Sequence, residues 1–204
     1  MALHALDKAA SLPLHSRTPL EWGASVLADP VRLLIDHAFL EKKAANNALE
    51  LMTRWPHDWV EGWVETMTAV ARDEAAHLAQ VTRLLMKRGG RLERVHKNPY
   101  ANALRQLVRK GGPGEVLDRL LISALIEVRS CERFAVLSAA SPDPELAAFY
   151  RALFSSEMGH YKVFLRLARK VSGRAVADAR WQEMLAAEAR ILARQEPGPR
   201  IHSR

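Results

Sequence analysis

The chain lacks the features that mark secreted and membrane-spanning proteins. Its single cysteine, Cys131, cannot form an internal disulfide and is compatible with a reducing cytosol. No apolar run reaches the roughly 18 residues that are needed to span a bilayer. The N-terminus contains Asp7 and Lys8 and has no apolar core of the signal-peptide type. These absences predict a cytoplasmic protein with no membrane partner.

Aromatic residues make up only 6% of the chain and β-branched residues are few, so an extended sheet is not expected. Leu, Ala, Arg and Glu dominate, which favours helices. Because 49% of the 204 residues are hydrophobic, the chain can bury a substantial core. No glycine cluster follows a strand, so no flavin or nicotinamide-binding motif is present. The composition predicts one all-α domain that covers residues 1–204.

Proline and glycine mark the boundaries of five predicted long helices. Asp29-Pro30 and Asp143-Pro144 are helix starts, Asp58 is a candidate cap, and Gly89-Gly90 ends a helix. The predicted helices cover residues 30–52, 58–87, 115–140, 144–172 and 175–195.

Residues 91–114 join the second helix to the third and contain a predicted short helix near 99–109. A long crossover of this kind is expected where a ferritin-like four-helix bundle joins its two helical hairpins. The last helix, at 175–195, would pack on the outside of the bundle. Residues 1–28 are expected to form an irregular lead-in, and residues 196–204 a loose tail.

Two of these helices place a carboxylate and an imidazole in an otherwise apolar stripe. In the segment VARDEAAHLAQ, Glu74 and His77 are three residues apart and project from one face of the helix. Burying an unpaired charge costs several kcal/mol, so both groups need a partner in the interior. The segment FSSEMGHYKVF repeats the arrangement with Glu157 and His160.

The other two central helices each add one acid to the stripe. Four carboxylates and two imidazoles match two divalent cations, the pattern of ferritin-like carboxylate-bridged sites. Ligands of this kind, without thiolate, favour iron or manganese. The stripes contain no Arg or Lys that would neutralise the acids instead. The predicted ligands, with Glu74 and Glu157 as bridges, are Glu41, Glu74, His77, Glu127, Glu157 and His160.

Three further residues near these positions have open or secondary roles. Glu132 lies on the same helix as Glu127, and only the stripe position favours Glu127 as the ligand. His37 lies one turn before a predicted ligand, and Asp73 directly precedes another. Both are expected to orient ligands by hydrogen bonds and not to bind metal themselves.

Four segments also resemble a known family: DHAFLEKKAANNALEL, ARDEAAHLAQV, LLISALIEVRSCERF and SSEMGHYKVFL. They are similar to the tRNA 2-methylthio-N6-isopentenyladenosine hydroxylases, called MiaE, over about residues 28–193, and all six ligand positions are filled. The resemblance implies a non-haem di-iron monooxygenase. It would hydroxylate the isopentenyl group of a modified adenosine beside the tRNA anticodon, with two iron ions, dioxygen, and two electrons from a separate reductase.

Basic residues are concentrated in one part of the chain. The interval from residue 83 to residue 110 has nine basic residues against one acid, Glu93, and therefore a charge of +8, which leaves −1 for the remainder. A polyanion such as the tRNA anticodon arm is the expected partner, although a solvated basic loop is the simpler alternative. The candidate tRNA contacts are Arg83, Lys87, Arg88, Arg91, Arg94, Lys97, Arg105, Arg109 and Lys110.

Two other functions are compatible with parts of this pattern. A ferritin-like oxidase, peroxidase or iron-handling protein would use the same ligands, but it predicts acid-lined entry routes and cage assembly. A metal-free helical bundle would bind RNA through the basic interval alone. Metal analysis separates the second alternative from the others. The sequence specifies neither the electron donor nor the oligomeric state.

Overall fold

The computed structural model describes residues 2–55 and 60–204, and every regular element in these ranges is a helix. The predicted all-α class is therefore confirmed. In chain order the helices are α1 (Ala2–Ala10), α2 (Leu20–Val26), α3 (Pro30–Arg54), α4 (Trp63–Lys87), α5 (Pro99–Arg105), α6 (Pro113–Ala140), α7 (Pro144–Ser172) and α8 (Arg174–Ala193). Among the described residues, no helix is both long enough and apolar enough to cross a membrane.

The contacts divide the chain into two compact units. The smaller unit comprises Asp29–Lys97 and Pro199–Ile201, and the larger comprises Met1–Ala28, Asn98–Gly198 and His202–Arg204.

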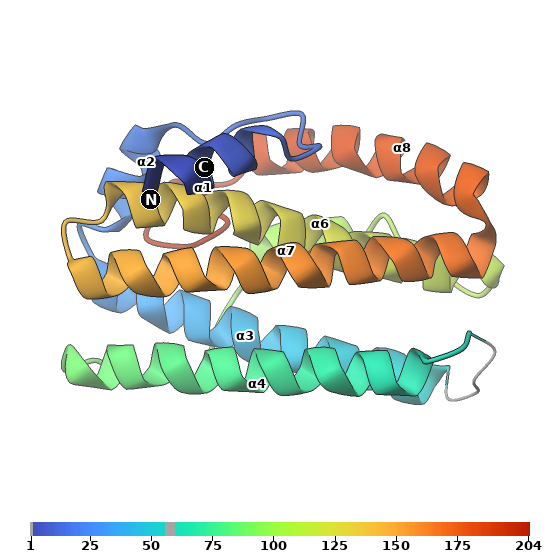
Figure 1. Ribbon diagram of the computed structural model, residues 1–204, viewed down its shortest axis with the longest axis horizontal. Coiled ribbons are helices and arrows are strands. Elements are labelled where there is room, and N and C mark those ends of the chain that lie inside the picture. Colours follow the sequence, from blue (N-terminus) through green and yellow to red (C-terminus); the bar gives the residue numbers. More distant parts are fainter. Residues whose placement is uncertain (1, 56–59) are drawn as a thin grey trace. The chain divides into compact units, whose positions relative to one another are not determined.

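Helices α3 and α4 form an antiparallel hairpin in the smaller unit (Figure 1). The Asp29 side chain accepts a hydrogen bond from the Arg32 amide, and Pro30 fills the first helical position, so α3 begins where the sequence predicts. Helix α4 begins later than expected, after Gly62, whose φ of 73° favours glycine. The predicted cap Asp58 lies outside the described residues.

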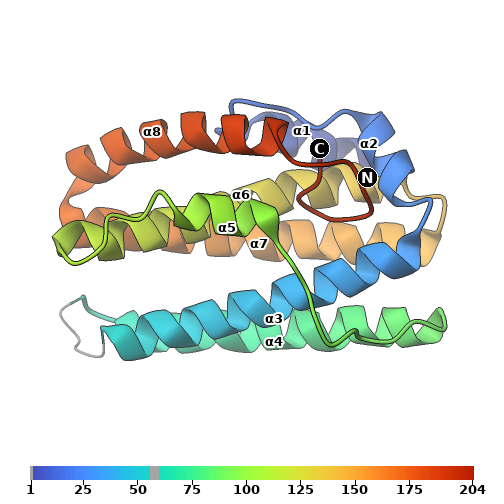
Figure 2. The same cartoon turned by 180° about the vertical axis from the view of Figure 1, so that it is seen from behind.

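Helices α6 and α7 form the central hairpin of the larger unit, and Asp143 caps α7 by accepting from the amides of Glu145 and Leu146 at 2.8 and 3.3 Å. Helix α8 returns along α6 and α7, and α5 packs against α6 and α8 (Figure 2). Because other helices contact α6 on several sides, buried residues occur all around it, as expected for a central helix.

The prediction of an irregular lead-in is wrong, because residues 1–28 contain α1 and α2, and both pack on α6. Trp22 of α2 is buried, and a Cβ at Gly23 would lie 2.7 Å from the Cβ of Ala140. The Arg17 guanidinium donates to the carbonyl of Leu12 at 2.7 Å and so fixes the connection between the two helices. Pro13 follows the end of α1, and Pro19 directly precedes the start of α2.

The prediction of a loose tail at 196–204 is also wrong for its last residues. In the smaller unit, the Ile201 amide donates to Asp36 at 2.9 Å. In the larger unit, the Trp22 indole donates to the Ser203 hydroxyl at 3.1 Å, and Arg133 donates to the Ser203 carbonyl at 2.8 Å. Burial and these bonds hold the tail in place although it has no helical periodicity.

Candidate metal centre

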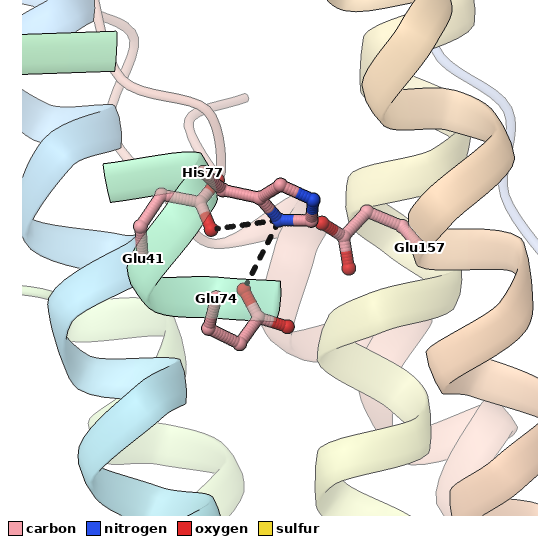
Figure 3. Close-up of side chains that lie close together, drawn as sticks. All are labelled: Glu41, Glu74, His77 and Glu157. Atoms are coloured by element: carbon pink, nitrogen blue, oxygen red, sulfur yellow. Dashed lines mark ion pairs between the residues drawn. The ribbon is translucent and has the colours of Figure 1, made fainter. Parts of the chain in front are cut away.

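The hairpin of α3 and α4 brings three predicted ligands together. Glu41 comes from α3, and Glu74 and His77 lie one turn apart on α4, all on the buried faces of their helices. The His77 Nδ1 atom lies 3.6 Å from Glu41 Oε2 and 3.4 Å from Glu74 Oε2 (Figure 3). One potential ligand atom from each residue lies within 4.8 Å of the others. We call these three residues the α3/α4 triad.

The hairpin of α6 and α7 carries a second triad of the same composition. Glu127 comes from α6, and Glu157 and His160 come from α7. His160 Nδ1 lies 3.2 Å from Glu157 Oε2, and potential ligand atoms of all three residues lie within 4.8 Å of one another. Each residue is at most 6% exposed, so water contributes little to stabilising their charges. We call these residues the α6/α7 triad.

The structure separates Glu127 from Glu132, which the sequence left as alternatives. Glu132 accepts hydrogen bonds from the amide and hydroxyl of Thr18, both at 2.5 Å, and pairs with Arg129 at 2.7 Å. These contacts use both carboxylate oxygens of Glu132 for holding the N-terminal segment against α6. The position of Glu127 within the α6/α7 triad favours it as the ligand.

The two residues expected to orient ligands differ in their surroundings. His37 is fully buried, and its Nε2 atom lies 2.5 Å from Glu41 Oε1, so its ring fixes one oxygen of that carboxylate. The Asp73 side chain is 41% exposed and pairs with Arg72 at 3.0 Å on the solvent side of α4. The orienting role predicted for Asp73 has no support from this placement.

Sequence reasoning missed a buried cluster of opposite charges in the larger unit. Arg129 makes two hydrogen bonds to Glu188 of α8, at 2.8 and 2.9 Å, in addition to its pair with Glu132. Burial opposes its charge, but the hydrogen bonds and charges of the glutamates outweigh burial and raise the pKa of Arg129. The sequence feature that pointed to this cluster is the position of Glu188 in the apolar stripe of α8, between Leu185 and Leu192.

Arg133 is the second buried arginine of α6. Burial lowers its pKa to about 10, although the charge of Glu132 acts in the opposite direction. Its guanidinium carbon lies 3.9 Å from the centroid of the Trp22 ring, a cation–π contact. The ion pairs of both buried arginines thus go to Glu132 and Glu188, away from the two triads.

Cys131 is fully buried near the α6/α7 triad, and its thiol contacts the Phe154 carbonyl at 3.7 Å. Burial first, and then the charges of Glu157 and Glu127, raise the pKa of this thiol. A thiol held in its neutral form is a poor metal ligand, so Cys131 fills the core.

The basic candidates are divided between the two units. Arg83, Lys87, Arg88, Arg91, Arg94 and Lys97 belong to the smaller unit, and Arg105, Arg109 and Lys110 to the larger. Most are exposed, as a phosphate contact requires. Arg109 is different, because it binds the buried carboxylate of Asp118 at 2.8 Å, which gives it a structural role.

Two helical hairpins, each with a buried Glu/Glu/His triad, define a protein of the ferritin-like class. A solved structure of the same fold, named Protein 43 with aldehyde deformylating oxygenase activity from Synechococcus, is similar with a TM-score of 0.87 and 35% identity. The similarity covers 93% of this chain and 95% of that one.

Within this class, the sequence model of the family described as tRNA-(MS[2]IO[6]A)-hydroxylase (MiaE) matches residues 7–203, and the chain belongs to this family. A relative from Pseudomonas putida named tRNA 2-(methylsulfanyl)-N(6)-isopentenyladenosine(37) hydroxylase is 40% identical over 186 residues, 91% of this chain and 89% of the relative. A relative of the same name from Salmonella typhimurium is 30% identical over 238 residues, 93% and 87% of the two chains. The resemblance noted from the sequence is thereby confirmed.

Proposed function

We propose that this chain is a tRNA hydroxylase that oxidises the isopentenyl group of 2-methylthio-N6-isopentenyladenosine beside the anticodon. Membership of the MiaE family and the names of two relatives support the substrate. The observation that carries the proposal is the pair of buried Glu/Glu/His triads, because surface RNA binding alone does not require them.

The donor set of the triads fits two iron ions. In the proposal, His77 would hold one iron and His160 the other. Glu74 and Glu157 would each serve both metals, and Glu41 and Glu127 would each serve one. Four carboxylates balance two divalent cations, and oxygen and imidazole donors suit iron or manganese. The buried arginines support this assignment, because their ion pairs go to other carboxylates.

The reaction converts a C–H bond, dioxygen, two electrons and two protons into an alcohol and water. Side-chain acids and bases cannot oxidise an unactivated C–H bond, and the iron pair supplies this redox chemistry when bound. The protein fixes the ligands, as His37 does for Glu41. Phe134 and Phe164 are buried in the larger unit, and an apolar interior would suit a prenyl group and exclude water. The two electrons come from a separate reductase.

The exposed basic residues would bind the phosphates of the anticodon arm. Phosphate contacts fix the orientation of a nucleic acid without reading its sequence. A modified base must leave its stack to reach a buried site, and this costs least in an unpaired loop. Arg109 is excluded from the proposed contacts, because Asp118 already binds its guanidinium.

Turnover of prenylated tRNA tests the proposal. Iron-loaded protein is incubated with the tRNA, a chemical reductant and dioxygen, and the nucleosides are analysed by mass spectrometry. We expect the modified adenosine to gain one oxygen atom, and Glu157→Gln to abolish this gain. Glu183→Gln, on the exposed side of α8, is the matched control and should retain activity. No gain from folded, iron-containing protein would refute the proposal.

The same assay, with an aldehyde offered in addition to the tRNA, tests an alternative substrate. The similar solved structure carries an aldehyde deformylating activity in its name, and its sequence is 35% identical to this one. Consumption of an aldehyde without any oxidation of the tRNA would assign the chain to that chemistry instead.

A further inference from the structure

The segment of residues 91–97, RLERVHK, connects α4 towards α5 and is anchored to α3 by His96. The His96 ring stacks on Phe39 with a centroid separation of 4.8 Å and an interplanar angle of 1°. Its Nδ1 atom lies 2.8 Å from Lys43 Nζ, and its Nε2 atom lies 2.7 Å from Asp36 Oδ1. Because an ammonium group only donates, Nδ1 accepts from Lys43, and Nε2–H donates to Asp36.

Two more contacts position the 91–97 segment. Immediately before it, a Cβ at Gly90 would lie 2.3 Å from Leu85 Cδ1, so a larger residue there would have to displace the end of the Leu85 side chain. Glu93, three residues before His96, turns towards α3 and lies 3.9 Å from Arg32. This exposed pair contributes little energy, but it places residues 93 and 96 on the same side of the segment.

The remaining residues form a repeated pair of a basic and an apolar side chain. Arg91-Leu92 and Arg94-Val95 are separated by Glu93, and Lys97 follows His96. All five are exposed; Leu92 is 49% and Val95 is 71% accessible. Single exposed apolar residues need no explanation, but here each apolar residue adjoins an arginine on an anchored segment.

We propose that the 91–97 segment binds an unpaired stretch of RNA, with Arg91, Arg94 and Lys97 at the phosphates and Leu92 and Val95 against the bases. Unpaired loops expose base faces to apolar side chains, whereas the deep, narrow major groove of a duplex hides its bases. The inference rests on the proposed function, which it deepens: it assigns to this segment the preference for a loop over a stem.

Binding measured without turnover tests this inference separately from the hydroxylase assignment. Fluorescence anisotropy compares two unmodified RNAs, a stem-loop with the sequence of an anticodon arm and a fully paired duplex of the same length. Leu92→Ser/Val95→Ser should weaken stem-loop binding about tenfold, the loss expected for two partly buried apolar contacts. Duplex binding should not change. Val176→Ser, an equally exposed apolar residue on α8, is the matched control and should bind both RNAs normally.

Two further variants complete the test. Arg91→Glu/Arg94→Glu should weaken binding of both RNAs and flatten its dependence on salt. His96→Ala should weaken stem-loop binding although every contact residue is kept, and it should speed tryptic cleavage after Arg91 and Arg94. Equal effects of Leu92→Ser/Val95→Ser on both RNAs, or no effect on either, would overturn the inference. The inference would also be overturned if these variants bound both RNAs normally and impaired only electron delivery by an acidic donor protein.

Discussion

At the scale of single residues, Glu127 and Glu132 illustrate how two acids on one helix acquire different functions. They are five residues apart on α6, and both are buried. Glu132 is neutralised by Arg129 and bound by Thr18, so it stabilises the fold. Glu127 shares its surroundings with Glu157 and His160, and in the proposed function a metal ion supplies the counter-charge.

Replacing each acid by glutamine should separate these functions. We expect Glu127→Gln to bind less iron while unfolding at a temperature close to that of the wild-type apoprotein. Glu132→Gln should retain its iron but lose about 3 kcal/mol of stability, because it leaves the buried Arg129 with one partner fewer. Iron analysis and thermal unfolding of the apoproteins measure both effects. The reverse pattern would make Glu132 the ligand.

The sequence predicted the burial of the triad residues better than the partners of Arg129, for a physical reason. An acid and a histidine three residues apart in an apolar stripe can be recognised from helix periodicity alone. The partners of Arg129 cannot, because Glu188 lies 59 residues away and becomes a neighbour only when α8 packs on α6. Asp73 follows the same geometry: it is adjacent to Glu74 in sequence but lies on a different face of α4, where it pairs with Arg72.

At the scale of elements, one buried carboxylate ties three parts of the larger unit together. Asp118 of α6 accepts from the backbone and side chain of Arg109, which follows α5, and from Arg180 of α8. Burial raises its pKa, but the hydrogen bonds from Arg109 and Arg180 have the larger combined effect, so the pKa of Asp118 is lowered from 3.8. The ionised carboxylate is therefore the form that stabilises the fold.

The stabilisation by Asp118 should depend on pH with a definite sign. A lowered pKa in the folded state means that the contribution is complete above pH 3.8 and is lost as the pH falls through the folded value. We expect Asp118→Asn to cost about 2 kcal/mol at pH 7. The difference from wild type should shrink below pH 3.8, as measured by urea unfolding at each pH. A constant difference at all pH values would contradict this account.

The long helices were predictable because each combines a start signal with a long apolar stripe, as α3 does with Asp29 and Pro30. The short elements were not. Helices α1 and α2 have 9 and 7 residues, too few to reveal a stripe, and their stability comes from packing on α6. The C-terminal tail is held by individual bonds to Asp36, Trp22 and Arg133, for which no sequence pattern exists.

At the scale of the whole molecule, the chain presents the same ligand set twice. One compact unit holds the α3/α4 triad, and the other holds the α6/α7 triad. Each triad supplies two carboxylates and one imidazole. The central proposal is that the residues of the two triads together hold two irons, as membership of the MiaE family and of the ferritin-like class leads us to expect.

Anomalous diffraction from crystals of the iron-loaded protein tests this claim most directly. We expect two iron peaks per chain, one bound by His77 and Glu41 and the other by His160 and Glu127. Glu74 and Glu157 should lie between them. A single peak, or iron bound elsewhere while the triads coordinate no metal, would contradict the account.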